Sequence, residues 1–380
     1  MKKIVGIIGS GNIGRDPFDK GSWSGSSYFF FTACSKAGLL YRAFGVEAPV
    51  HVRIPLMLNN FAFKKSVWRE KFYLDTGYYD ALTKKVQNSL LSSDYRYDFV
   101  QIGAIYDVPK LVKGKAKCYS YHDGNLAQNV KSPYFNKEIP RRVVDRALEY
   151  EGRVYRGLDK IFTMSEYLRR SFIEDYGISP DKVVCIGAGI NLENVPPSIP
   201  DKDYSRKSIL FIGVDFYRKG GLQLLQAFRL ARESLRDATL TIVGPPQLQI
   251  DDDLAKGVKY LGFLSKSDPA HKILFENALR EATLFVMPSL YEPFGIAPLE
   301  AMVNEIPCIL TNQWALPEMV TPGETGELVE CGDVDGLAER MIEILNSPDK
   351  LRSMGQLARK IVLQEFTWKR VVERLSAAID

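Results

Sequence analysis

Two glutamates, Glu292 and Glu300, stand eight positions apart in the stretch SLYEPFGIAPLEAM (289–302). The residues between and around them are nearly all apolar, so a solvated charged surface explains these acids poorly. Carboxylate oxygens accept hydrogen bonds from hydroxyl groups, including the paired hydroxyls of a ribose. One acid for a ribose and one for another hydroxylated group is a sensible division between these two carboxylates. A sugar nucleotide would supply both.

The residues between the two acids favour a turn followed by a helix. Gly295 would let the chain turn tightly and expose the backbone amides of Gly295 and Ile296. Pro298 suits a first helical turn, because it lacks the N–H that would have no partner there. We expect Glu300 in that same first turn, where the helix dipole favours a negative charge.

A second stretch, GVDFYRKGG (213–221), combines cations with glycines. It lies between a predicted strand and a predicted helix, and open α/β sheets bind ligands at the carboxyl ends of their strands. Arg218 and Lys219 would add their charge to the amides of a helix N-terminus, which makes an anion site. We expect these two residues to bind phosphate.

The first half of the chain contributes His122, which ends a predicted strand in KCYSYHDGN. Strand ends of this kind line the ligand-binding edge of a sheet, so His122 is a candidate site residue. His51 falls in a strand-like segment and His271 on a predicted helix. We expect both to be structural.

The segment GSGNIG (9–14) matches the G-x-G-x-x-G pattern of dinucleotide-binding proteins. That pattern needs a helix that opens at the glycines, and no helical periodicity begins before Ser26. Nor does an acid end a second strand, because Glu47 precedes the segment VHVRIPL (50–56) that we expect to be that strand. An NAD-dependent oxidoreductase is therefore the weaker alternative.

We favour a different role for the glycine-rich loop from Gly9 to Ser27. Gly21 and Gly25 would let backbone amides approach a ligand ahead of the helix that begins near Ser26. The loop would then form one lip of a cleft. A flexible surface loop is the competing interpretation.

Strands that alternate with helices position these residues. The expected strands are KKIVGIIG, VHVRIPL, YDFVQIG, KCYSYHD, KIFTMS, KVVCIG, SILFIG, ATLTIVG, VKYLGF, TLFVMP and PCILT. This order predicts parallel sheets covered by helices on both faces. The proline-containing stretch 191–207 is typical of a linker. We expect an α/β protein with two doubly wound, Rossmann-like domains, residues 1–203 and 204–380, that face a central cleft.

Composition excludes several classes of protein. A hydrophobic content of 46% and a charged content of 25% describe a globular chain. Five scattered cysteines without a C-x-x-C pair argue against a disulfide framework or zinc site and for a reducing compartment. The apolar start is too short for a signal peptide or membrane span, so we expect a cytoplasmic location.

Three further segments accompany the acid-rich stretch in a resemblance to a known family. The stretch itself resembles the E-x7-E motif of retaining, family 4 type glycosyltransferases of the GT-B fold. GVDFYRKGG resembles the G-x-x-x-x-x-K-G phosphate loop of that family. TMSEYLRRSFIEDYG with KVVCIGAGIN, and LPEMVTPGETGELVE, resemble its interdomain and later segments. The likeness covers most of residues 160–345.

The resemblance implies roles for individual residues. Lys219 and Arg218 would hold the donor diphosphate, Glu300 the ribose, and Glu292 the donor sugar. His122 matches a family position at the donor sugar. The full implied set is His122, Glu292 and Lys219 for catalysis, and Gly25, Arg218, Lys219, Glu292, Phe294, Gly295, Ile296 and Glu300 for donor binding. The family often has arginine where this chain has Val214, so Arg218 either supplies that charge or leaves the diphosphate to Lys219 and backbone amides.

The implied reaction is transfer of a hexose-type sugar from a nucleoside diphosphate to a hydroxyl, with retention of configuration. Cationic side chains would stabilise the leaving group, so we expect no metal and no cofactor. We expect the run Asp251–Asp253 to lie in a solvent-exposed loop and not to bind a metal. A sugar-nucleotide epimerase is the nearest alternative. A glycosidase would need two carboxylates around one bond but no phosphate loop.

The acceptor would be a glycan, a lipid-linked molecule or a small molecule, and we expect no nucleic-acid partner. Residues 1–200 carry 29 Lys and Arg against 20 Asp and Glu, a balance of +9, while the remainder balances at −5. One basic cluster is interleaved with aromatic residues: Lys64, Lys65, Arg69 and Lys71 with Phe61, Phe63, Trp68, Phe72 and Tyr73. This cluster predicts peripheral contact with an anionic membrane. The competing interpretation is that these aromatic residues line a soluble acceptor pocket or pack in the core.

Overall fold

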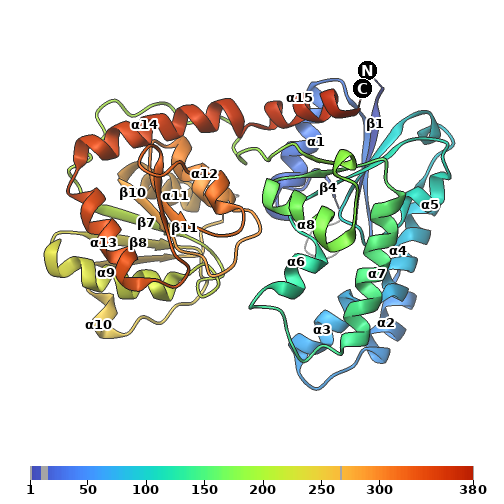
Figure 1. The fold of residues 1–380 in the computed structure, drawn as a ribbon, viewed down its shortest axis with the longest axis horizontal. Helices are drawn as coiled ribbons and strands as arrows, with labels where there is room; N and C mark the ends of the chain where they lie inside the picture. Colours follow the sequence, from blue (N-terminus) through green and yellow to red (C-terminus); the bar gives the residue numbers. More distant parts are fainter. Residues whose placement is uncertain (1, 10–15, 266–267, 380) are drawn as a thin grey trace. The chain divides into compact units, whose positions relative to one another are not determined.

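The computed structural model describes residues 2–9, 16–265 and 268–379, and the chain divides into two compact units. The first unit comprises Met1–Asn191 and Trp368–Asp380, and the second comprises Leu192–Thr367. Each unit holds one six-stranded sheet in which every hydrogen-bonded pair of strands is parallel (Figure 1). The predicted α/β class with two doubly wound sheets is confirmed.

The first sheet has the order β2-β1-β3-β4-β5-β6. Its strands are β1 (Ile4–Gly9), β2 (Leu40–Val46), β3 (Asp98–Ile102), β4 (Cys118–His122), β5 (Lys160–Thr163) and β6 (Val183–Cys185). The helices of this unit are α1 (Ser26–Lys36), α2 (Val50–Asn59), α3 (Lys65–Tyr73), α4 (Thr76–Ser89), α5 (Val108–Val112), α6 (Leu126–Lys131), α7 (Arg141–Gly157), α8 (Glu166–Tyr176) and α15 (Trp368–Ile379). Every residue of β1 and β3 is buried, as expected for strands covered on both faces.

The second sheet has the order β12-β11-β10-β7-β8-β9. Its strands are β7 (Ser208–Ile212), β8 (Thr239–Val243), β9 (Val258–Gly262), β10 (Leu284–Met287), β11 (Cys308–Thr311) and β12 (Gly326–Val329). Its helices are α9 (Gly221–Ser234), α10 (Asp252–Ala255), α11 (Pro269–Glu281), α12 (Ile296–Val303), α13 (Val334–Leu345) and α14 (Pro348–Glu365). The sheet order reverses direction between β10 and β7, whose carboxyl ends therefore form a switch point.

One expected strand is wrong. The segment VHVRIPL lies in helix α2, and the second strand of the chain is β2, which the sequence pattern did not reveal. Alternating Val50, Val52 and Ile54 mimic the two-residue period of a strand. β2 is an edge strand whose residues are mostly half-buried, so it lacks the continuous apolar run by which the other strands were recognised.

The division of the chain also differs from the expected boundary at residue 203. The last helix, α15, belongs to the first unit rather than to the second. Trp368 anchors it: its indole Nε1 donates to Asn191 Oδ1 at 3.0 Å, and its backbone nitrogen lies 2.4 Å from where a Cβ on Gly189 would be. Only glycine at 189 permits this approach.

The expected linker contains no helix or strand between Leu192 and Lys207, yet it is bound to the second unit. Lys202 Nζ donates to the Asn304 carbonyl at 3.0 Å, and the Tyr204 hydroxyl donates to the Glu305 carbonyl at 2.7 Å. Both side chains are buried. The change from one unit to the other therefore takes place near Asn191, at the start of this stretch.

Candidate functional site

The loop between β7 and α9 contains the two predicted phosphate-binding residues. It ends at Gly220, the N-cap of α9, which has a φ of 73°. A Cβ at this position would lie 2.0 Å from the Pro288 carbonyl oxygen at the end of β10. Glycine therefore allows the β7–α9 loop to lie against the loop after β10, which contains Glu292.

Lys219 and Glu292 form an ion pair across these two loops. Lys219 Nζ lies 2.6 Å from Glu292 Oε2, and the glutamate side chain is only 6% exposed. The lysine crosses directly over Gly213, where a Cβ would meet Lys219 Cδ at 2.4 Å. Glycine at position 213 therefore leaves room for the lysine side chain, and the carboxylate of Glu292 holds its ammonium group in place.

Arg218 lies beside the same carboxylate. Its Nη1 is 3.7 Å from Glu292 Oε2 and donates to the Tyr291 carbonyl at 2.7 Å. Its Nε donates to Asp215 Oδ2 at 3.0 Å, and its own carbonyl accepts from the Leu290 amide at 2.9 Å. The guanidinium group is thus fixed by three partners at the edge of the site.

This arrangement bears on Val214, where the family often has arginine. The Val214 side chain is exposed and supplies no charge. Arg218 lies four residues later in the same loop and reaches the carboxylate that Lys219 also contacts. That Arg218 supplies the second charge to a diphosphate stays a prediction, and the geometry is compatible with it.

Helix α12 begins at Ile296, with Gly295 as an N-cap that offers no side-chain hydrogen bond. The first amides of a helix have no partner within it, so those at the start of α12 can receive a ligand. Pro298 is the third helical residue, as its missing N–H predicts. Phe294 and Ile296 are half-buried. These observations agree with the expected turn, and the donor-binding roles stay predictions.

The expected placement of Glu300 in the first turn of this helix is wrong. Because α12 begins at Ile296, Glu300 is its fifth residue and lies in the second turn. The helix dipole acts mainly at the terminal turn, so it does not explain this acid. Glu300 is instead a buried residue whose carboxylate requires polar partners. Its proposed contact with a ribose stays a prediction.

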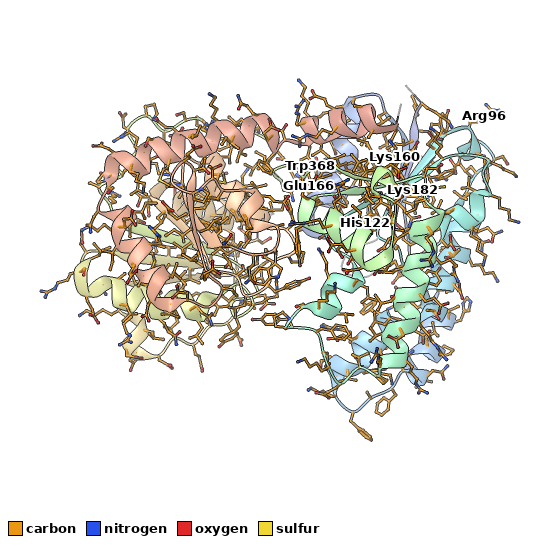
Figure 2. All side chains as sticks on the ribbon, viewed as in Figure 1. Arg96, His122, Lys160, Glu166, Lys182 and Trp368 are labelled. Atoms are coloured by element: carbon orange, nitrogen blue, oxygen red, sulfur yellow. The ribbon has the colours of Figure 1, made fainter. Side chains whose placement is uncertain are left out.

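His122 is the last residue of β4 and is buried in the first unit (Figure 2). Its Nε2 lies 2.7 Å from Ser120 Oγ, and its ring centroid lies 5.5 Å from that of Tyr155 and 5.1 Å from that of Phe172. Burial lowers the pKa of His122 to about 3. The imidazole is therefore neutral at physiological pH, so it can orient a hydroxyl but not act through a charge.

The loop before α1 contains Gly25, which caps this helix with a φ of 88°. Trp23 and Ser24 also have positive φ values, 48° and 55°, which is strained for residues with side chains. Two hydrogen bonds stabilise this strained backbone. Trp23 Nε1 donates to Asp123 Oδ2 at 2.8 Å, and Asn191 Nδ2 donates to the Ser24 carbonyl at 2.8 Å. Sequence patterns gave no sign of this turn.

The dinucleotide fingerprint is only partly covered, because residues 10–15 lie outside the described residues. Helix α1 begins at Ser26, as predicted, and not at the glycines. The other argument against the fingerprint is wrong: β2 ends at Val46, so Glu47 directly follows the second strand. Glu47 Oε1 accepts from Arg53 Nη1 at 2.6 Å. Glu47 thus lies where dinucleotide-binding proteins have the acid that binds the ribose hydroxyls, but its carboxylate is paired with Arg53.

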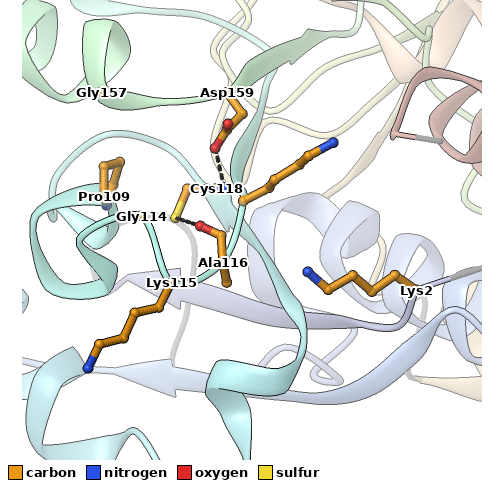
Figure 3. Close-up of a pocket in the computed structure, with 9 residues that line it drawn as sticks. Lys2, Pro109, Gly114, Lys115, Ala116, Cys118, Gly157 and Asp159 are labelled. Atoms are coloured by element: carbon orange, nitrogen blue, oxygen red, sulfur yellow. Dashed lines mark hydrogen bonds between the residues drawn. The ribbon is translucent and has the colours of Figure 1, made fainter.

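Other candidates lie elsewhere. A cavity of about 410 Å³ is lined by Lys115, Lys117 and Asp159 among others, at the amino ends of β4 and β5 (Figure 3). This is the sheet edge opposite the one that binds ligands in such folds. Asp251–Asp253 are exposed, as expected. Within the described ranges, no group of three or more His, Cys, Asp or Glu residues is arranged to hold a metal ion, and no helix has the length and apolar run needed to cross a bilayer.

Asp215 and the Tyr291 carbonyl are contacts of the site that the sequence interpretation did not single out. Both bind Arg218. Asp215 lies inside the phosphate-loop pattern and could have been found by asking which acid pairs with the arginine. The Tyr291 carbonyl has no signature in a sequence, because any residue supplies a carbonyl.

Comparison with known proteins agrees with this fold. Residues 197–361 match the family described as glycosyl transferases group 1, and residues 49–194 match glycosyltransferase family 4. Among curated relatives, the alpha-maltose-1-phosphate synthase of Mycolicibacterium smegmatis is 29% identical over 57% of this chain and 61% of its own. A GDP-mannose-dependent monoacylated alpha-(1-6)-phosphatidylinositol monomannoside mannosyltransferase of Corynebacterium glutamicum is 31% identical over 58% and 61%.

These matches span about three fifths of the length of each relative. Solved structures share the fold over the whole chain. The sucrose-phosphate synthase of Thermosynechococcus elongatus superposes with a TM-score of 0.72 at 17% identity, covering 100% of this chain and 98% of that one. HepE of Anabaena, in complex with UDP, gives 0.64 at 17% identity and 99% of both chains. With both family matches and both sheets in place, the chain belongs to the GT-B fold glycosyltransferases of the family 4 type.

Proposed function

We propose that this protein transfers a hexose-type sugar from a nucleoside-diphosphate sugar to a hydroxyl acceptor, with retention of anomeric configuration. The observation that carries the proposal is the convergence of Lys219 and Arg218 on Glu292, next to the uncapped start of α12. Two cations and free helix amides suit a diphosphate, and a buried carboxylate suits sugar hydroxyls.

The ion pair between Lys219 and Glu292 explains how the site stays folded without a donor. A carboxylate that is 6% exposed needs a partner, and Lys219 supplies it at 2.6 Å. When a diphosphate binds, the lysine gains a second anion, and Glu292 can turn its free lone pairs to a sugar hydroxyl. The same contact thus orders the cation beforehand, which lowers the cost of arranging it around the donor.

The reaction breaks the bond between the anomeric carbon and a phosphate oxygen, and forms one between that carbon and the acceptor oxygen, whose proton passes to the departing diphosphate. Negative charge grows on the departing diphosphate. Lys219, Arg218 and the amides of α12 are arranged to stabilise that charge. We therefore propose that no metal ion takes part.

A thermal-shift screen tests the proposal. Nucleoside diphosphates and their sugar esters should raise the melting temperature of the wild type, because a ligand that binds only the folded state stabilises it. The same ligands should have little effect on Lys219→Ala. Stabilisation by NAD and not by nucleoside diphosphates would contradict the proposal and favour the oxidoreductase alternative, for which Glu47 is the pertinent residue. Conversion of the donor to its epimer without an acceptor would favour an epimerase.

A further inference from the structure

Helix α2 of the first unit carries an apolar stripe that faces solvent. Val50, Ile54 and Leu58 recur at every fourth residue, which places them on one face of the helix. Phe61 and Phe63 follow in the connection to α3. The exposed fractions are 65% for Val50, 53% for Ile54, 69% for Leu58, 55% for Phe61 and 100% for Phe63. These five residues, called here the α2 stripe, are too contiguous to be the scattered apolar exposure of an ordinary surface.

The stripe is distinct from the face by which α2 joins its unit. Leu56, on the opposite side of the helix, and Met57, at the border of the stripe, pack against the core of the first unit. The Met57 carbonyl accepts from Trp68 Nε1 at 2.7 Å, which fastens α3 to α2. The packing of α2 is thus complete without Ile54 or Leu58. Figure 1 shows α2 and α3 at the end of this unit away from the two termini.

The aromatic residues divide between this surface and the core. The Phe61 ring lies 5.4 Å from that of Phe63 and 6.0 Å from that of Trp68, so the three form one cluster. Phe72 is buried in the core of the unit. For Phe72, the alternative of packing in the core therefore holds, and this residue is not part of the surface cluster.

Positive charge surrounds the stripe. Residues 50–73 contain five Lys and Arg (Arg53, Lys64, Lys65, Arg69 and Lys71) and one acid, Glu70, a balance of +4. Arg53 pairs with Glu47, and Lys64 pairs with Glu138. Lys71 Nζ donates to the Phe61 carbonyl at 3.4 Å, so its ammonium group lies beside the aromatic cluster. Lys64, Lys65 and Arg69 are exposed.

We propose that the α2 stripe is a docking surface for an anionic lipid bilayer. Apolar side chains on one face of a helix, with cations beside them, suit burial in the headgroup region while the cations contact acidic lipid. A second copy of the chain would bring two surfaces of like charge together, which disfavours it. A closed acceptor pocket does not suit Phe63, which is wholly exposed. This inference stands independently of the transfer reaction, because it concerns only where the first unit binds.

Co-sedimentation of the full chain with lipid vesicles tests the proposal. Vesicles of phosphatidylcholine mixed with phosphatidylglycerol should bind the protein, pure phosphatidylcholine should bind it weakly, and added salt should weaken binding to the anionic vesicles. The pair Ile54→Gln and Leu58→Gln should lower the partition coefficient by roughly tenfold or more. The matched pair Ile273→Gln and Leu274→Gln, two exposed residues of α11 in the other unit, should leave it unchanged.

Charge is tested in the same way. Lys64→Glu with Lys65→Glu should lower the partition coefficient for anionic vesicles roughly tenfold or more. Each lysine that is lost removes the binding free energy that one cation gains near acidic lipid. Lys84→Glu with Lys85→Glu, an adjacent exposed lysine pair on α4, is the matched control and should have a much smaller effect. Far-ultraviolet circular dichroism of each variant checks that it is folded.

A position-specific readout completes the test. Trp68 borders the stripe, so brominated anionic lipid should quench its fluorescence, and this quenching should disappear in Trp68→Phe. Absence of binding to anionic vesicles at low salt, or binding that the stripe variants leave unchanged, would overturn the proposal. A dimer in light scattering that Ile54→Gln with Leu58→Gln abolishes would overturn it in favour of a second copy.

Discussion

The carboxyl ends of the two sheets differ in whether their candidate site residues carry charge. In the second unit, Lys219 and Arg218 both contact the carboxylate of Glu292, at 2.6 and 3.7 Å. At the end of β4 in the first unit, His122 is held neutral by burial, with its pKa lowered to about 3. The first arrangement can exchange one anion for another. The second has no charge to exchange and can act only through shape and neutral hydrogen bonds.

Glu151 makes the same contrast with Glu292. It is a buried carboxylate near His122, but its Oε2 accepts from the Tyr176 and Tyr155 hydroxyls, at 2.6 and 3.1 Å, rather than from a cation. Burial raises the pKa of Glu151. A carboxylate held by hydroxyl groups joins helices α7 and α8, whereas one held by a lysine and an arginine stays available to a ligand. The partner, more than the acid itself, therefore distinguishes a structural site from a functional one.

The largest expected effect follows from removing the exchangeable cation. Lys219→Ala should lower kcat roughly 100-fold or more, the magnitude for one preorganised group that stabilises developing charge. Steady-state kinetics of sugar transfer measure this. Lys207→Ala, which breaks an ion pair with Asp237 in the same unit, is the matched control and should leave kcat unchanged. If Arg218→Ala is damaging and Lys219→Ala is not, the roles of the two cations are reversed.

Glu300→Gln should have the next largest effect. A neutral amide loses charge-assisted hydrogen bonds to the ribose, at a cost of about 1.5–3 kcal/mol. This corresponds to a donor affinity lowered roughly 10- to 150-fold. Calorimetric titration with a nucleoside-diphosphate sugar measures it. Glu327→Gln, at another buried glutamate of this unit, should bind the donor like the wild type. Unchanged affinity in Glu300→Gln would rule out the ribose contact.

His122 should reveal its neutral state in the pH dependence of stability. Its folded-state pKa, about 3, lies below the ordinary value of 6.5. Between these values the unfolded chain binds a proton that the folded chain does not, so acid favours unfolding. The stabilisation is complete above pH 6.5 and is lost as the pH falls toward 3, by up to about 1.4 kcal/mol per pH unit. Chemical denaturation from pH 7 to pH 5 should give a steeper loss for wild type than for His122→Asn. Equal slopes would mean that the fold does not lower the pKa of His122.

The smallest expected effect is that of metal removal. Since Lys219, Arg218 and helix amides are proposed to neutralise the leaving group, transfer should continue unchanged in excess chelator. Activity assayed before and after dialysis against chelator measures this. An activity that chelator abolishes and magnesium or manganese restores would show that the charges of the second unit are insufficient by themselves.

The parts of the fold that could be predicted share a physical cause. Strands such as β1 and β3 are buried throughout, so most of their residues are apolar and these segments stand out in the sequence. β2 lies at a sheet edge and is half-buried, so its composition is mixed and gave no signal. The error at α2 has the same origin in reverse. Its solvent-facing Val50 and Ile54 imitate a strand because burial, which usually explains such residues, is absent there.

The candidate site could be predicted where charged residues and glycines match the spacing of the E-x7-E motif and of the phosphate loop. Lys219, Glu292 and the Gly295 turn were found in this way. The placement of Glu300 was wrong by one turn, because a helix start depends on where the chain leaves its turn and not on Pro298 alone. The strain at Trp23 and Ser24 could not be predicted, since it arises from contacts with Asp123 and Asn191, which are distant in sequence.

The membership of α15 in the first unit sets an order for synthesis on the ribosome. Leu192–Thr367 is one uninterrupted segment, so the second unit has its whole sequence before the first unit does. Until Trp368–Ile379 emerges, the nascent first unit lacks helix α15. The buried side chains of this helix are those of Trp368, Val371, Val372 and Leu375. Its partner helix α1 meanwhile keeps an uncovered apolar face. Translation therefore passes through a stage in which residues 1–191 still lack helix α15, while residues 192–367, the whole second unit, have already been made.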